Sequence, residues 1–128
     1  MIKQFSVFLE NRPGRLACLV DLLSKNGIKI MAMSIAEAGN YGIVRCVLDN
    51  DAKALAILKD ANTAVNIVDV LILELGEIDA VVKALEKAGV NIDYAYTMNG
   101  GKIVVKVNDE EKAIGVLKES KLKVLTKP

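Results

Sequence analysis

The chain has 128 residues, of which 52% are hydrophobic and 26% charged, as in ordinary folded globular proteins. The net charge is +1, so composition gives no electrostatic argument for binding nucleic acid or a membrane surface. The absence of histidine excludes a histidine general base, a His-containing triad and a histidine metal ligand. No phosphate-binding glycine motif occurs, and the two cysteines do not form a CxxC pair. We therefore expect no catalytic site, no cofactor and no metal.

The predicted elements follow the order strand-helix-strand-strand-helix-strand, which is the split βαβ or ferredoxin-like pattern. A strand is predicted at residues 4–10, followed by a helix that stops at Asn26-Gly27 and has the apolar face Leu16, Leu19, Val20 and Leu23. Two strands follow, at residues 28–38 and 43–48, with a turn between them. A second helix has the apolar face Ala54, Ile57, Leu58 and Ala61, and the chain is extended again from Val65.

This pattern then occurs a second time. Leu23 to Ile30 returns as Leu85 to Ile92 at an offset of 62 positions (85 − 23). Asp51 to Ala54 returns as Glu110 to Ala113 at an offset of 59 (110 − 51), so we expect one loop to be three residues shorter in the second copy. The repeated elements are a strand at 68–75, a helix at 77–88, strands at 90–98 and 102–107, a helix at 110–119 and a strand at 122–125.

We predict an α+β protein of two ferredoxin-like domains, residues 1–66 and 67–128, with antiparallel sheets and helices on one face. A domain of about 60 residues is only marginally stable by itself, so the two copies are expected to pack together. No glycine or proline marks a linker between residues 64 and 75, which predicts a fixed arrangement of the copies. Duplication of one small unit favours paired binding surfaces over a single deep cleft.

The segment from Glu10 to Leu16 has the features of a binding site at a strand-to-helix turn. Asn11 suits the N-cap, Pro13 suits a first helical turn, and Gly14 lets another group approach the backbone. The N–H groups of residues 14–16 would point outward at the positive end of the helix, where a carboxylate binds well. Arg12 and Arg15 would add positive charge. The same residues also start an ordinary helix, so a purely structural role is the alternative.

The second copy bears on these alternatives. At the offset of 62, residues 73–78 align with residues 11–16, keep the glycine and lose the asparagine, the proline and both arginines. Helix-starting geometry therefore does not need those residues, which favours a binding role for them in the first copy.

The residues Val7 to Leu16, followed by a helix and by Asn26 to Ile30, resemble the start of an ACT domain. The second copy resembles the same family through Leu85 to Tyr94, and the likeness covers nearly the whole chain. The pattern is similar to that of small stand-alone proteins made only of two tandem ACT domains. The resemblance implies regulatory binding of small molecules, usually amino acids, by domains that pair side by side into one continuous sheet.

The resemblance also implies a ligand at the junction of two domains, held by the strand-helix loop of one and the second strand of the other. The matching residues are Asn11, Pro13, Gly14, Arg15 and Leu16 in the loop, Lys29, Ile30 and Met31 in the second strand of the first copy, and Asn91, Ile92 and Asp93 in that of the second copy. Asp93 would meet an ammonium group, or would be a solvated strand carboxylate. Leu73 to Ile78 departs from the loop pattern, so we expect one competent loop per chain.

We predict a non-catalytic regulatory protein that binds a free amino acid at the ACT–ACT junction and forms a homodimer or higher homo-oligomer. One alternative is a regulatory subunit of an amino-acid biosynthetic enzyme, similar to the small subunit of acetohydroxyacid synthase. The other is a ligand-free oligomerisation module. A transcriptional regulator is disfavoured because no basic patch is present.

The expected location is the cytoplasm. Met1-Ile2-Lys3 leads directly into a strand pattern, so we expect no signal peptide. No apolar run approaches the roughly 20 residues that a membrane span needs. Cys18 and Cys46 have no counterparts in the second copy and are expected to be cytosolic thiols.

Overall fold

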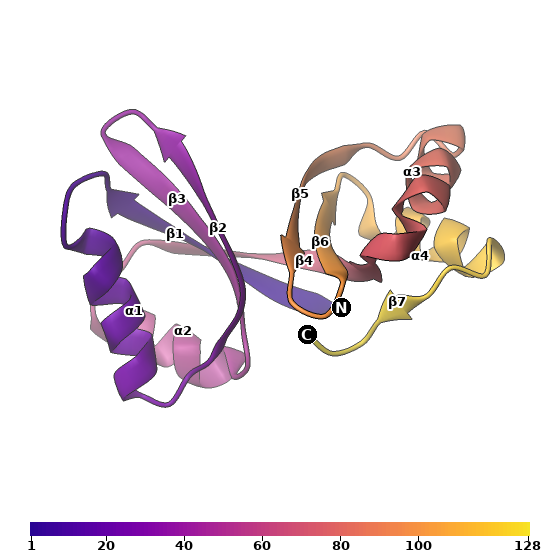
Figure 1. Ribbon diagram of the computed structural model, residues 1–128. Helices are drawn as coiled ribbons and strands as arrows, with labels where there is room; N and C mark the ends of the chain where they lie inside the picture. The colour runs from indigo at the N-terminus through magenta and orange to yellow at the C-terminus, as the bar shows by residue number, and fades with distance from the viewer. The chain divides into compact units, whose positions relative to one another are not determined.

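The computed structural model describes all 128 residues and contains seven strands, four α-helices and one short 3-10 helix (Figure 1). In chain order these are β1 (Ile2–Glu10), α1 (Arg15–Lys25), β2 (Ile30–Ala38), β3 (Tyr41–Leu48), α2 (Asp51–Asp60), β4 (Val65–Glu74), η1 (Leu75–Glu77), α3 (Ile78–Lys87), β5 (Ile92–Met98), β6 (Lys102–Val107), α4 (Glu110–Glu119) and β7 (Val124–Leu125). The chain forms two compact units, residues 3–68 and residues 69–128, and Met1 and Ile2 belong to the second. None of the helices is long and apolar enough to span a membrane.

Residues 3–68 have the strand order β2-β3-β1-β4, and the β1–β3 and β2–β3 pairs are antiparallel. Both helices, α1 and α2, lie on one face of this sheet (Figure 1). The core between sheet and helices contains fully buried side chains from every layer: Phe5 and Val7 of β1, Leu23 of α1, Val44 and Cys46 of β3, and Ala54 and Leu58 of α2. The predicted ferredoxin-like βαββαβ unit is thus present.

Residues 69–128 have the equivalent order β7-β4-β6-β5, again with antiparallel pairs. The core of this unit contains the corresponding side chains: Leu71 and Leu73 of β4, Val81 and Leu85 of α3, Val105 and Val107 of β6, and Ala113 and Leu117 of α4. The predicted fold class, α+β with two ferredoxin-like units, is confirmed.

The second helix of each unit shows how closely the duplication is kept. Asn50 caps α2 and Asp109 caps α4, both with φ −146° and ψ 93°. Each side chain accepts a hydrogen bond at 3.1 Å from a backbone N–H three residues later, that of Lys53 or Lys112. Side-chain oxygens at an N-cap satisfy N–H groups that have no partner inside the helix. The two copies therefore start this helix in the same way, at the offset of 59.

The three-residue difference between the copies lies in the hairpin strands, and the prediction of a shorter loop is wrong. β2 and β3 have 9 and 8 residues, whereas β5 and β6 have 7 and 6. The turn itself is longer in the second copy, residues 99–101 against residues 39–40. The first unit therefore has a hairpin that extends two residues further on each strand.

β4 is one continuous strand, where the sequence predicted extended chain from Val65 as the end of the first copy and a strand at residues 68–75 as the start of the second. Residues 70–73 of this strand are all at most 1% exposed, so both of its faces are buried. Residues 46–48 and 103–105 are also buried on both faces, with at most 3% and 8% exposure respectively. A continuous apolar run is typical of a strand buried on both sides, and this signal is visible in the sequence.

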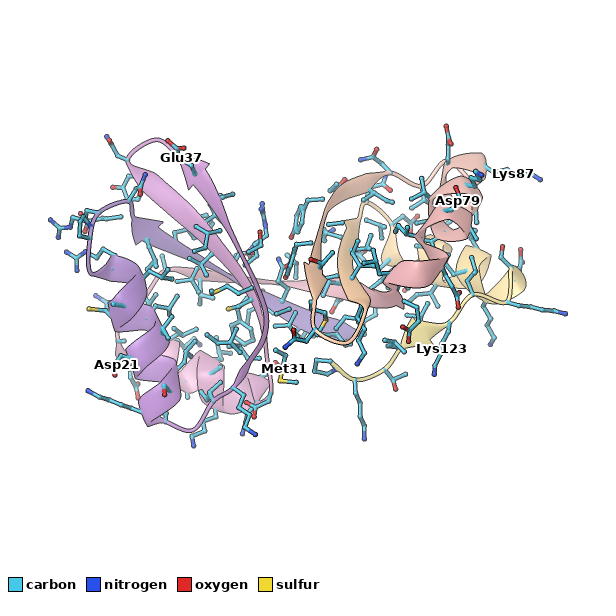
Figure 2. All side chains as sticks on the ribbon, in the orientation of Figure 1. Asp21, Met31, Glu37, Asp79, Lys87 and Lys123 are labelled. Atoms are coloured by element: carbon cyan, nitrogen blue, oxygen red, sulfur yellow. The ribbon has the colours of Figure 1, made fainter.

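The first helix of each unit buries a slightly different face from the predicted one. Leu22, not Val20, accompanies Leu16, Leu19 and Leu23 on the core of the first unit, and Val82 of α3 is 40% exposed. Charged side chains occupy the outer faces of these helices, including Asp21 on α1 and Asp79 on α3 (Figure 2). Each pairs with a lysine one turn later at 3.0 Å. Exposed pairs of this kind contribute about 0.3–0.5 kcal/mol.

Candidate ligand-binding loop

The connection between β1 and α1 is a tight turn followed directly by the helix. The Arg15 N–H faces the Arg12 carbonyl at 3.4 Å, with Pro13 and Gly14 at the centre of the turn. Gly14 has φ 91° and ψ −19°, the conformation that the third residue of a type II turn requires. Gly14 is also the N-cap of α1, and its carbonyl accepts the first helical hydrogen bond from Cys18 at 3.0 Å. The prediction that Asn11 caps this helix is wrong.

Asn11 instead connects the loop to the β2–β3 turn. Its backbone N–H donates to the Asn40 carbonyl at 2.7 Å, and its side-chain Nδ2 donates to the Gly39 carbonyl at 3.1 Å. One of the two N–H donors of the Asn11 amide is therefore used to hold the loop, and the contribution of Asn11 to ligand binding stays a prediction. The contact exists because the first hairpin is long enough to reach the loop.

The two arginines of the loop share one carboxylate. Arg12 Nε lies 3.3 Å from Glu10 Oε2, and Arg15 Nη2 lies 3.4 Å from Glu10 Oε1. All three side chains are about half exposed, so these pairs are screened by solvent and contribute little to stability. The cluster has one positive charge in excess.

These residues surround a hollow in the surface. It has a volume of about 340 Å³ and is lined by Arg12, Pro13, Gly14, Arg15 and Cys18. The backbone N–H groups of Leu16 and Ala17 lie in the first turn of α1, where no acceptor exists within the helix. The Leu16 side chain packs toward the core. The structure thus brings four predicted loop residues together around one opening, with positive charge and free N–H groups beside it.

The predicted second-strand residues occupy equivalent places in the two units. The Lys29 N–H donates to Asp49 Oδ1, and the Asn91 N–H donates to Asn108 Oδ1, both at 2.9 Å. Ile30 and Ile92 pack against the cores of their units. Met31 and Asp93 follow them, at the point in each copy where the register of strand pairing shifts.

Asp93 already has a cationic partner. Its Oδ1 accepts a hydrogen bond from Asn91 Nδ2 at 2.9 Å, and its Oδ2 lies 3.8 Å from Lys106 Nζ. Lys106 also donates to Glu110 Oε1 at 3.1 Å, and its side chain is only 17% exposed. The ammonium group beside Asp93 in the structure is therefore that of Lys106, a neighbour that the sequence did not indicate.

The connection between β4 and α3 is built differently, and the alignment of residues 73–78 with residues 11–16 is wrong. Leu73 pairs with Ile103, and Val7 pairs with Val44, the equivalent of Ile103 at the offset of 59 (103 − 44). Leu73 thus corresponds to Val7, and both are 0% exposed in their cores. The offset between the copies falls from 66 in the strand (73 − 7) to 62 in the helix (85 − 23), so this connection is four residues shorter in the second copy, and the short η1 replaces the loop. The second unit lacks the loop altogether.

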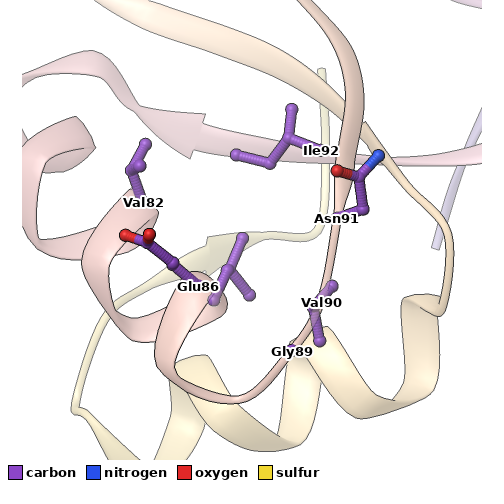
Figure 3. Close-up of a pocket in the computed structure, with 7 residues that line it drawn as sticks. Val82, Glu86, Gly89, Val90, Asn91 and Ile92 are labelled. Atoms are coloured by element: carbon purple, nitrogen blue, oxygen red, sulfur yellow. The ribbon is translucent and has the colours of Figure 1, made fainter.

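A further hollow lies in the second unit between α3 and the start of β5 (Figure 3), and its lining includes the predicted site residues Asn91 and Ile92 beside helix residues that the sequence did not indicate. It has a volume of about 490 Å³, and Figure 3 shows Val82 and Glu86 on the helix opposite Asn91 and Ile92, where β5 begins. Val82 is the equivalent, at the offset of 62, of Val20, which the predicted face of the first helix includes. Val82 directly follows the buried Val81, and nothing in the sequence indicates that its side chain lines an opening.

The two cysteines differ in environment, and both are free thiols. Cys46 lies in the first core, and burial raises its pKa to about 12. Cys18 is exposed on α1. No group of three or more Cys, Asp or Glu side chains is placed to hold a metal ion.

The fold and this loop define a class of regulatory domain. The family model for the ACT domain pair matches residues 1–127, and the chain belongs to that family. The predicted membership in a family of tandem ACT domains is confirmed. ACT domains are regulatory rather than catalytic.

Solved structures with the same fold are known. A protein from Bacteroides thetaiotaomicron is 37% identical, with a TM-score of 0.90 over 97% of this chain and 91% of that one. The ligand-free regulatory subunit of aspartate kinase from Thermus thermophilus is 18% identical, with a TM-score of 0.66 over 94% of this chain and 91% of that one. The same subunit from Thermus flavus is 19% identical, with a TM-score of 0.64 over 93% and 92%. The comparison with curated proteins gave no match.

Proposed function

We propose that this protein is a regulatory protein that binds a free amino acid through the β1–α1 loop of its first unit. The observation that carries the proposal is the hollow lined by Arg12 and Arg15, beside the free N–H groups of the first turn of α1. Guanidinium groups and helix N-termini both favour a carboxylate, which every free amino acid has. Membership in a regulatory family supports this function, and so does the similarity in fold to aspartate kinase regulatory subunits.

One site per chain follows from the difference between the copies. The second unit lacks the four additional residues, and Glu77 occupies the position of Arg15 at the offset of 62. The contributions of Lys29, Ile30 and Met31, and of Asn91, Ile92 and Asp93, stay predictions. Asp93→Asn and Met31→Ala test them individually in the assay below.

The test is a thermal-shift screen of the purified chain against the twenty amino acids. A ligand at about 100 times its dissociation constant stabilises the folded state by roughly 2.7 kcal/mol, which shifts melting by several degrees. Arg12→Gln and Arg15→Gln should each reduce that shift. Lys25→Gln is the control, because Lys25 is an exposed cation at the opposite end of α1 that pairs with Asp21.

A flat screen would contradict the proposal. An unchanged shift in the double variant Arg12→Gln, Arg15→Gln would also contradict it, because the ligand would then bind elsewhere. Co-purification with a larger catalytic chain would favour the regulatory subunit of a biosynthetic enzyme, as would a shift that appears only in that complex.

We further propose that the chain forms a homo-oligomer in the cytoplasm. β2 is an edge strand of nine residues with one charged side chain, and Met33 and Ile35 on it are 40% and 52% exposed. Long apolar edges of this kind are usually covered by another strand. Two free thiols fit a reducing compartment. Sedimentation equilibrium tests the assembly, and a monomer at all concentrations, with no change on Ile35→Lys, would contradict it.

A further inference from the structure

A second hollow in the first unit lies between α1 and the turn that follows α2. It has a volume of about 350 Å³ and is lined by Leu9, Arg15, Cys18, Leu19, Leu22, Ala61 and Thr63. Most of these side chains are apolar, and only Arg15 and Thr63 provide a strong polar group. Pockets for small molecules are typically of at least about 300 Å³, mostly apolar, with a few polar groups that fix orientation.

This apolar hollow shares residues with the hollow at the loop. Arg15 and Cys18 line both of them. The two hollows therefore adjoin, and a small molecule with its carboxylate at the loop would have its apolar group under α1. The apolar portion would contact Leu9, Leu19 and Leu22, which are at least partly buried in the core of the unit.

The second unit shows what the same place looks like without these features. The equivalents of Arg15, Cys18 and Thr63 are Glu77, Ala80 and Leu122. Leu122 packs against the core of its unit, so a larger apolar side chain is accommodated at this position of the fold. Thr63 is smaller and half-buried in the first unit. The apolar hollow is thus associated with the copy that has the binding loop.

We propose that the ligand of the loop is an α-amino acid with a sizeable apolar side chain, and that this side chain occupies the hollow between α1 and residues 61–63. The inference rests on the proposed function for the carboxylate and adds the class of side chain. Small or charged amino acids would leave the hollow empty or place a charge among leucines. Each buried methylene improves affinity roughly fourfold, so leucine should bind on the order of 50-fold more tightly than alanine.

The experiment is calorimetric titration of the full chain with L-leucine, L-phenylalanine, L-alanine, L-serine and L-lysine. It is combined with amide chemical-shift mapping of the wild-type protein with L-leucine. Leucine or phenylalanine should bind at least tenfold more tightly than the other three, and shifts should include Cys18, Leu22 and Thr63. Thr63→Leu introduces the residue of the second copy and should weaken leucine binding at least tenfold, with alanine binding unchanged. Thr97→Leu, on exposed strand surface, is the matched control and should change neither affinity.

The outcomes separate the two proposals. If amino acids bind with no preference for apolar side chains, or if shifts appear at Arg12 and Arg15 but not at Leu22 and Thr63, this inference is overturned and the proposed function stands. If Thr63→Leu fails to fold, the shift map of the wild-type protein still decides the question. If none of the five amino acids binds, this inference is overturned, and the screen against all twenty amino acids decides the proposed function.

Discussion

The conformation of Gly14 makes a prediction that depends on backbone geometry alone. Gly14 has φ 91°, and a Cβ added there would meet no atom within 4 Å. Gly14→Ala therefore introduces no clash. What it costs is the left-handed conformation itself, about 1–2 kcal/mol for a residue with a side chain. A small gain from restricting the unfolded chain offsets part of this cost, so we expect a net loss of about 1 kcal/mol.

Gly115 is a control with the same substitution and the opposite expected sign. It lies on the exposed side of α4, in the interior of the helix, and an added Cβ again meets nothing within 4 Å. Alanine is more favourable than glycine in a helix interior by roughly 0.5–1 kcal/mol, so Gly115→Ala should stabilise. The two variants should differ by about 2 kcal/mol although each adds only one methyl group.

Urea unfolding followed by circular dichroism measures both variants, with the slope of each transition checked against wild type. A difference of 2 kcal/mol corresponds to roughly 8 °C in melting temperature for a domain of this size. If Gly14→Ala were neutral or stabilising, the turn at Arg12–Arg15 would not have the backbone described here. The account of how the loop places Arg12 and Arg15 would then be wrong.

Three further predictions concern the rest of the chain. Asn50→Ala and Asp109→Ala should each cost about 1 kcal/mol in urea unfolding, because the two caps have the same geometry; a loss at only one would contradict the shared cap. Leu73→Asn should lower the free energy of unfolding by about 3 kcal/mol or more without creating a binding site, because Leu73 is 0% exposed in the core. A mild effect would instead support the alignment of Leu73 with Asn11 of the loop. The pKa of Cys46 is raised by burial from 9.0 to about 12, so its contribution to stability is complete below about pH 9 and is lost as pH rises toward 12. Unfolding free energies of wild type and Cys46→Ala should therefore converge over that range, and a constant difference would refute the buried thiol.

Much of the fold was predictable from the sequence because both units rely on local signals. The Asn26-Gly27 stop, the helix over residues 110–119 and the strand over residues 102–107 are observed within a residue or two of the prediction. Each depends on periodicity, a cap or a glycine with positive φ, which are properties of a few neighbouring residues. The repeat itself is confirmed by the equivalent caps.

The errors arose where the arrangement depends on residues far apart in the chain. Asn11 is a residue type that commonly caps helices, but its side chain donates to the turn at residues 39–40 instead, a contact between segments that are distant in the chain. Leu73 aligns with Asn11 when the helices are matched without gaps, and only strand pairing shows that it corresponds to Val7. Lys106 lies beside Asp93 because neighbouring strands bring them together. None of these relations is encoded in local sequence.

The ion pairs at Glu10 have a consequence for how any anion would be recognised. Since Glu10 already neutralises one of the two arginines, an incoming carboxylate replaces an internal partner more than it adds a new one. Binding is then an exchange of one carboxylate for another, and the charge contribution to affinity is the small difference between two similar interactions. Glu10→Gln would remove the competitor and should tighten binding of every carboxylate alike. Discrimination between ligands must accordingly come from the rest of the molecule.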